Sequence, residues 1–139
     1  MVFQTENDSI IYFTNLLNQN GYNAVPTQSI NQYAFFDILS TDSNNKRILF
    51  ECKNRRFQHD RFGDSVMEKY KLDKFLQKRN HFDEAYLVSM FTNVITISNV
   101  FSDYTTTYEW CPQTTDFQNN QMVKKELVHY QQEWFVNYV

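Results

Sequence analysis

Residues 33–53 read YAFFDILS, then TDSNN, then KRILFECK. The two outer runs are rich in apolar and β-prone residues and have the length of buried strands, while the polar residues between them favour a turn. We therefore predict a β-hairpin. Three ionisable residues, Asp37, Glu51 and Lys53, interrupt the apolar runs where a purely structural strand would carry Val, Ile or Thr. Charges at these positions indicate a functional site.

The register of this hairpin decides whether the charges meet. Side chains alternate between the two faces of a strand, so Glu51 and Lys53 point to one face and Cys52 points to the other. If the loop has an odd number of residues, such as 42–46, the numbers of facing residues sum to 88 and Asp37 lies opposite Glu51. An even loop separates them. With the odd loop, the Cβ atoms lie roughly 5 Å apart, and the two carboxylates could share one small cation.

The pattern of Asp37, a strand, a turn and then Glu51-Cys52-Lys53 resembles the PD-(D/E)XK nuclease superfamily, which includes restriction-endonuclease-like and junction-resolvase-like enzymes. The resemblance covers roughly residues 5–97. It implies that Asp37, Glu51 and the main-chain carbonyl of Cys52 hold Mg²⁺ or Mn²⁺, and that Lys53 orients the attacking water. Phe36 stands where the motif often has Pro, although many members lack that Pro. The implied fold is an α/β (α+β) three-layer sandwich, in which helices flank a central mixed β-sheet.

The composition indicates one globular domain over residues 1–139. Hydrophobic residues make up 42% of the chain and aromatic residues 17%, which favours a packed core over a disordered chain. No apolar run approaches the length of a membrane span, and the N-terminus carries no secretory pattern. We therefore expect a soluble protein without a membrane partner, in the cytoplasm, of the host cell if the protein is viral. The 2 Cys and 3 His residues are scattered and predict no zinc site.

The net charge of −3 hides a basic segment. Residues 46–79 hold eleven Lys and Arg against five Asp and Glu, while the rest of the chain holds two against eleven. The basic segment includes the predicted site. Because Lys and Arg position phosphate groups, this local patch matters more than the net charge and favours binding to the DNA backbone. The alternative for its helical part is an ordinary solvated helix face.

Residues 5–21 predict a helix with a capping box of Thr5 and Asp8 and a left-handed stop at Gly21. Glu6 then lies at the end of a stripe formed by Ile10, Phe13 and Leu17. In several families that resemble this chain, an acid on the first helix completes the metal site, and Glu6 is the candidate. The alternative is a first-turn acid that complements the helix dipole.

Basic residues follow the hairpin directly. Arg55 and Arg56, with Arg61 further on, could grip the backbone beside the scissile phosphate, and surface charge is the alternative. Residues 65–79 predict a second helix with a capping box of Ser65 and Glu68. Its apolar side would be formed by Val66, Tyr70, Leu72, Phe75 and Leu76, and its outer face, which could track DNA, by Lys71, Lys74 and Lys78. By the resemblance, Glu68 and Lys71 could instead lie beside the metal ligands.

The other parts of the chain carry fewer signals. A short strand at 22–25 precedes the hairpin, and two further strands are predicted at 85–91 and 93–99, the first of them central because it is apolar on both faces. Residues 104–110 are β-prone. Residues 122–139 could form a strand followed by a short helix, or one long helix. Trp110 and Trp134 more often indicate core or oligomer contacts than base stacking, and a homodimer is therefore kept open.

Together these patterns predict a Mg²⁺- or Mn²⁺-dependent DNA endonuclease. The absence of a visible recognition module in the sequence favours cutting of branched DNA over recognition of a long sequence. A composition rich in Asn, Phe and Tyr is typical of an AT-rich genome, such as that of a phage or other mobile element. Two alternatives remain: a catalytically inactive nuclease-fold module that binds DNA or protein, and a structural protein in which the three charges coincide by chance.

Overall fold

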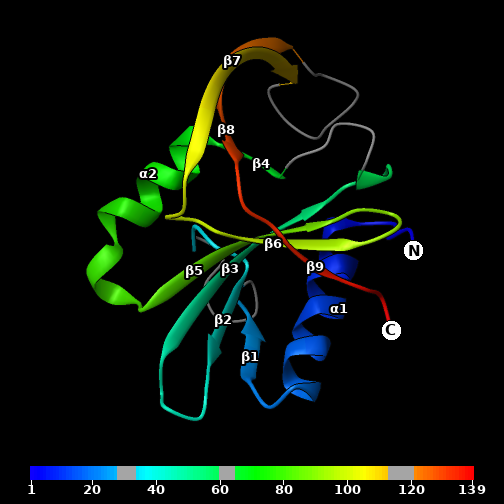
Figure 1. Ribbon diagram of the computed structural model, residues 1–139, viewed down its shortest axis with the longest axis vertical. Coiled ribbons are helices and arrows are strands. Elements are labelled where there is room, and N and C mark those ends of the chain that lie inside the picture. The colour runs from blue at the N-terminus through cyan, green and yellow to red at the C-terminus, as the bar shows by residue number, and fades with distance from the viewer. Residues whose placement is uncertain (28–33, 60–64, 113–120) are drawn as a thin grey trace.

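The computed structural model describes residues 1–27, 34–59, 65–112 and 121–139, and within these ranges it contains two β-sheets and two α-helices. The larger sheet has six strands in the order β1 (Asn23–Pro26), β2 (Ile38–Thr41), β3 (Arg47–Asn54), β5 (Glu84–Met90), β6 (Ile95–Asn99) and β9 (Trp134–Val136). Neighbouring strands of this sheet pair antiparallel, except for β3 and β5, which run parallel. The sheet is therefore mixed, as predicted (Figure 1).

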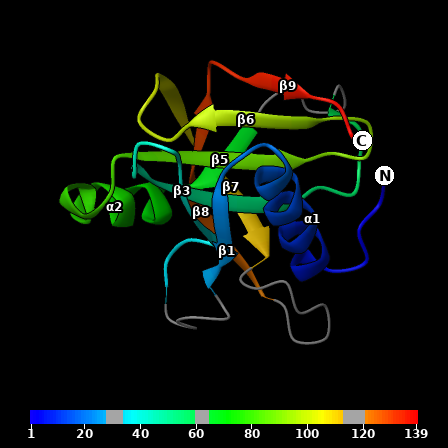
Figure 2. The ribbon, with the colours of Figure 1, turned by 90° about the horizontal axis from the view of Figure 1, so that it is seen from below.

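Helix α1 (Glu6–Gln19) covers one face of this sheet (Figure 2). Thr5 accepts a hydrogen bond from the Asp8 N–H, and the Asp8 side chain accepts one from the Thr5 N–H, so the predicted capping box is confirmed. Gly21 has a φ of 90°, which an L side chain rarely adopts, and it ends the helical region as predicted. The α1 stripe of Ile10, Phe13 and Leu17 is buried against the sheet.

A second, three-stranded sheet stands against the other side of the large sheet (Figure 1). Its strand order is β4 (Ser65–Glu68), β8 (Met122–Tyr130) and β7 (Tyr104–Pro112). Helix α2 (Lys69–Gln77) follows β4 and leads through the 3₁₀ turn η3 (Arg79–His81) into β5. Leu49 of β3 packs there in a second core with Leu72 and Phe75 of α2, Leu87 of β5 and Val128 of β8.

The second helix begins four residues later than predicted. Residues 65–68 form a strand because each pairs with β8, from Ser65 opposite Tyr130 to Glu68 opposite Leu127. The predicted capping box is therefore wrong: Glu68 occupies the N-cap position without a side-chain capping bond. Of the predicted apolar side, Leu72 and Phe75 are buried, whereas Tyr70 and Leu76 are exposed.

The C-terminal segment contains no helix within residues 121–139. It forms β8 and β9, so the strand at its start is confirmed and both predicted helices are wrong. The β-prone residues 104–110 and the predicted strands at 22–25, 85–91 and 93–99 are confirmed to within two residues at most ends, and β5 is central and buried on both faces. The first hairpin strand begins at Ile38 instead of Tyr33, which lies outside the described ranges. In the described parts of the chain, no helix is long and apolar enough to cross a membrane.

Candidate functional site

The two predicted acids lie near each other at one end of the β2–β3 hairpin. Ile38 faces Phe50 and Thr41 faces Arg47, so facing residue numbers sum to 88, and residues 42–46 form the odd loop. The Asp37 N–H donates to the Phe50 carbonyl at 2.9 Å, although Phe50 is already the partner of Ile38, so the chain leaves the sum-88 register by one residue at Asp37. The odd register is therefore confirmed for residues 38–41, whereas the expected direct pairing of Asp37 with Glu51 is not present. The two acids are still close, since the charge of Glu51 raises the pKa of Asp37.

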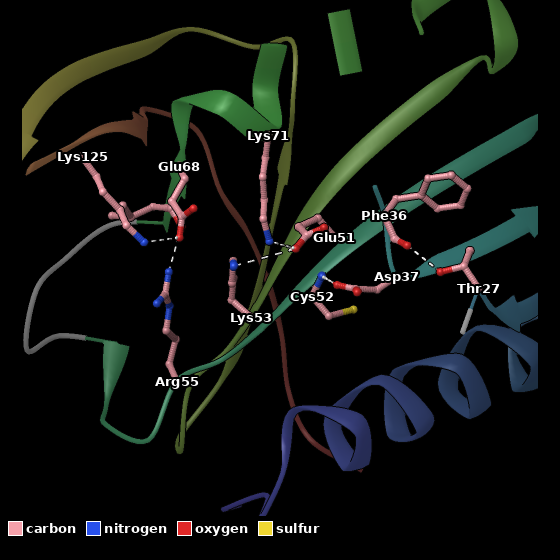
Figure 3. A network of polar contacts seen from close by, with 11 residues as sticks. Thr27, Phe36, Asp37, Glu51, Cys52, Lys53, Arg55, Glu68, Lys71 and Lys125 are labelled. Atoms are coloured by element: carbon pink, nitrogen blue, oxygen red, sulfur yellow. Dashed lines mark hydrogen bonds and ion pairs between the residues drawn. The ribbon is translucent and has the colours of Figure 1, made fainter. Parts of the chain in front are cut away.

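Asp37 is held in place by the backbone of β3. Its Oδ2 accepts a hydrogen bond from the Cys52 N–H at 2.7 Å (Figure 3). Its pKa is raised from 3.8 to about 7, first because burial disfavours the charged form and then because the Glu51 charge is close. The charge of Glu6 adds to this rise. A buried carboxyl beside other acids is a group that a bound cation would stabilise.

Glu51 is the most buried charge of the site, with 3% of its side chain exposed. Its Oε1 accepts a hydrogen bond from Lys71 Nζ at 2.6 Å and lies 3.8 Å from Lys53 Nζ. Figure 3 shows both lysines converging on this carboxylate, one from α2 and one from β3. Glu51 and Lys53 therefore share one face of β3, as predicted, while Cys52 is buried against α1 on the other.

The two lysines have different electrostatic surroundings. Burial lowers the pKa of Lys53, and the positive charge of Lys71 lowers it further, against the opposing charge of Glu51. Burial would also lower the pKa of Lys71, but the charge and hydrogen bond of Glu51 raise it above its usual value. Lys71 is therefore the main partner of Glu51, and Lys53 is the lysine that releases its proton more readily.

A cleft of about 1050 Å³ opens beside this cluster. Its lining includes two acidic side chains, Glu6 and Glu68, and five basic ones: Lys53, Arg55, Arg56, Lys71 and Lys125. Some of these are fixed by short contacts, since Arg55 donates to the Val66 carbonyl at 2.8 Å and Arg56 donates to the Gln4 carbonyl at 2.6 Å. The excess of positive charge suits an anionic polymer such as a nucleic acid.

Some predicted DNA-binding residues lie elsewhere. Lys74 and Lys78 are exposed on α2 and do not line the cleft, whereas Lys71, predicted on the same outer face, turns inward because Glu51 binds it. The three lysines therefore do not form one continuous face. Arg61 lies outside the described ranges.

Two other residues gain roles from the tertiary structure. Lys125 of β8 lines the cleft and lies 3.5 Å from Glu68 Oε1, and sequence reasoning missed it because no local signal indicates that β8 pairs with β4. Arg55 and Lys125 both point toward Glu68 (Figure 3). The pKa of Glu68 is lowered, since the charges of Lys53, Lys125 and Lys71 outweigh its burial. Glu68 thus belongs to the electrostatic network of the site.

The oxygen donors available for a metal are limited. In the part of the chain that the structure describes, no group of three or more His, Cys, Asp or Glu side chains is arranged to hold a metal ion. Glu6 is exposed at the rim of the cleft and acts on Asp37 through its charge. The candidate donors are therefore the carboxylates of Asp37 and Glu51 and, as predicted from the resemblance, the Cys52 carbonyl. This all-oxygen set fits Mg²⁺ or Mn²⁺, which prefer carboxylate, carbonyl and water ligands.

Comparisons with models of protein families, with curated proteins and with solved structures found no match for this chain. The residues and geometry of the site therefore have to indicate its function.

Proposed function

We propose that this protein is a metal-dependent DNA endonuclease of the PD-(D/E)XK type, with Asp37, Glu51 and Lys53 as catalytic residues. The observation that carries the proposal is the convergence of these three charges on one end of the β2–β3 hairpin. Three contacts support it: the charge of Glu51 acts on Asp37, Asp37 Oδ2 accepts a hydrogen bond from the Cys52 N–H, and Lys53 Nζ lies 3.8 Å from the Glu51 carboxylate. A purely structural hairpin has no need for two acids here, because their repulsion and burial cost stability.

The arrangement of the elements also supports the proposal. Helix α1 is followed by the antiparallel strands β1, β2 and β3, then by β4 of the smaller sheet, by α2 and by β5, which runs parallel to β3. Apart from the inserted β4, this is the order of helix, strands, helix and strand that the resemblance implies, and it supports the proposal. The candidate catalytic residues lie where the motif expects them, just before β2 and within β3.

In this proposal, Asp37, Glu51 and the Cys52 carbonyl hold Mg²⁺ or Mn²⁺. The bound ion would polarise a phosphoryl oxygen and lower the pKa of a coordinated water. The Lys53 amine lines the cleft, where it can orient that water and balance the negative charge that develops on the phosphate. Arg56 carries N–H groups beyond the one that binds the Gln4 carbonyl, and they can contact the flanking backbone.

The direct test is cleavage of a panel of linear duplex, single-stranded, flapped and four-way-junction DNA, with Mg²⁺ or Mn²⁺ and with EDTA. The wild type should cut at least one of these substrates when Mg²⁺ or Mn²⁺ is present, and none in EDTA. We expect the substrate that is cut to be branched DNA. Asp37→Asn, Glu51→Gln and Lys53→Ala should abolish cutting while DNA is still bound. Asp103→Asn, which alters an exposed acid away from the cleft, is the matched control and should cut like the wild type. Full activity of Asp37→Asn would refute the assignment.

A second candidate is a nuclease-fold module that binds DNA or a protein without cutting. The observation that favours it is the contact of Glu51 with two lysines, which satisfies the buried acid without a metal. This function predicts that no substrate of the panel is cut, that DNA or protein binding persists in EDTA, and that a calorimetric titration with Mn²⁺ releases no binding heat.

A further inference from the structure

The Glu51 carboxylate is already paired with a cation of the protein, the Lys71 ammonium. Lys71 Nζ lies 2.6 Å from Glu51 Oε1, shorter than the 3.8 Å to Lys53, and only 3% of the Glu51 side chain is exposed. A metal ion that binds Glu51 must approach the same buried carboxylate. Access to Glu51 therefore depends on where Lys71 goes.

The charges of the site show why the Lys71 ammonium and a metal ion cannot both stay beside Glu51. When all four groups are ionised, the carboxylates of Asp37 and Glu51 match the ammonium groups of Lys53 and Lys71 and the charges sum to zero, and a proton on Asp37 would make the sum positive. Adding a divalent cation without moving a group would leave two uncompensated positive charges in a largely buried cluster, which is strongly unfavourable. If the Lys71 ammonium leaves, the acids, Lys53 and the metal sum to +1, which one phosphodiester group would neutralise.

The structure provides an exit for this side chain. Lys71 lies in the first turn of α2, which Leu72 and Phe75 anchor in the second core, so the side chain can swing while the helix stays in place. It is 20% exposed and lines the cleft. Glu68 lines the same cleft, and the charge of Lys71 already acts on it, so the displaced ammonium has an acceptor nearby.

We propose that Lys71 is the resident counter-cation of Glu51 and that a divalent metal binds this site by displacing the Lys71 ammonium into the cleft. This inference rests on the metal site of the proposed function and adds a residue that controls its affinity. Lys71 is then a positioning residue, which holds the carboxylate in place until the metal arrives and sets the metal concentration that the site requires.

The test is a calorimetric titration of the full chain with Mn²⁺. Because a charged hydrogen bond no longer competes, Lys71→Met should bind Mn²⁺ at least about tenfold more tightly than the wild type. Lys71→Arg keeps a cation on Glu51 and should bind at close to the wild-type affinity. Lys74→Met removes an exposed lysine of the same helix and is the matched control, with unchanged affinity. Equal Mn²⁺ affinity of Lys71→Met and the wild type would overturn the inference.

The two proposals fail in different ways. If the wild type binds Mn²⁺ and Asp37→Asn does not, the metal site stands, and the Lys71 variants alone decide the inference. If neither the wild type nor Lys71→Met binds Mn²⁺, both the metal site and the inference are wrong. Lys71→Gln serves if Lys71→Met does not fold. As an independent readout, saturating Mn²⁺ should raise the Tm of the uncharged variant more than that of the wild type, and an equal rise would contradict displacement.

Discussion

The two faces of β3 are both buried but are stabilised by different forces. On one face, Ile48, Phe50 and Cys52 pack against α1 in an apolar core. On the other, Leu49 packs toward α2, but Glu51 and Lys53 follow it and meet the Lys71 ammonium. Dispersion and the hydrophobic effect hold the first face, whereas the second depends on charge pairing that pH, salt and a metal ion can change.

This difference separates the parts of the strand that carry stability from those that carry chemistry. The apolar face fixes the position of β3 relative to α1 and supplies the free energy of folding. The charged face can therefore hold its acids in a defined geometry without contributing to stability. Substitutions on the two faces should therefore have separable effects.

The largest expected effect on stability is at Phe50. This ring is 5% exposed, and its centroid lies 5.4 Å from that of Phe13 and 5.7 Å from that of Tyr86. Phe50→Ala should lower the free energy of unfolding by about 4 kcal/mol, because it removes buried contacts and leaves a cavity. Urea denaturation at several pH values should give the same loss at each. Phe50→Leu, which keeps most of the volume, should cost less than about 1.5 kcal/mol. If Phe50→Ala lowers the free energy of unfolding by less than about 1.5 kcal/mol, the apolar face does not carry the stability.

The next effect is a pH dependence from the charged face. Folding raises the Asp37 pKa from 3.8 to about 7, so between these values the folded protein keeps a proton that the unfolded chain has released. The free energy of unfolding should therefore fall as pH rises from about 4 to about 7, by at most roughly 4 kcal/mol at 1.4 kcal/mol per pH unit. Below pH 4 and above pH 7, Asp37 should contribute no slope.

Asp37→Asn isolates this contribution, because an amide does not titrate. Urea midpoints of the variant and the wild type should converge at acid pH and separate in favour of the variant toward pH 7. Parallel curves across this range would show that Asp37 is not the group responsible.

The smallest expected effect is at the start of α1, which supports the apolar face. Thr5→Ala removes the hydroxyl that accepts from the Asp8 N–H and should lower the free energy of unfolding by about 1 kcal/mol. Thr5→Ser keeps the cap and should be nearly neutral. Neither change should alter metal affinity, because the Thr5 hydroxyl bonds to the backbone of α1 and is not one of the candidate metal donors. Thermal unfolding followed by circular dichroism, with a Mn²⁺ titration alongside, checks both statements.

Local patterns predicted the elements that are stabilised within a short stretch of chain. The capping box of Thr5 and Asp8, the turn at residues 42–46 and the alternation along β3 each depend on neighbours a few residues away. These features placed the two acids at one end of the hairpin, but they left the choice between an odd and an even loop to the structure. The mixed sheet was expected from the resemblance, and the α+β architecture agrees with it.

Predictions failed where distant strands override local preference. Residues 65–68 have a helix-capping pattern, but pairing with β8 and burial of Met67 hold them as a strand. Residues 134–136 join the edge of the large sheet beside β6, where an amphipathic helix was an equally reasonable expectation from the pattern alone. In both cases the partner strand lies more than thirty residues away in the sequence, so no local pattern reports it.

The sequence by itself determined the hairpin and the shared face of Glu51 and Lys53, because period-two alternation is a local property, while the structure decided that the loop is odd. Only the tertiary structure decided that Lys71 turns inward onto Glu51 and that Lys125 joins the cleft. Those contacts depend on how α2 and β8 pack against β3. A buried carboxylate attracts whichever cation the packing brings within reach, and spacing along the chain does not encode that distance.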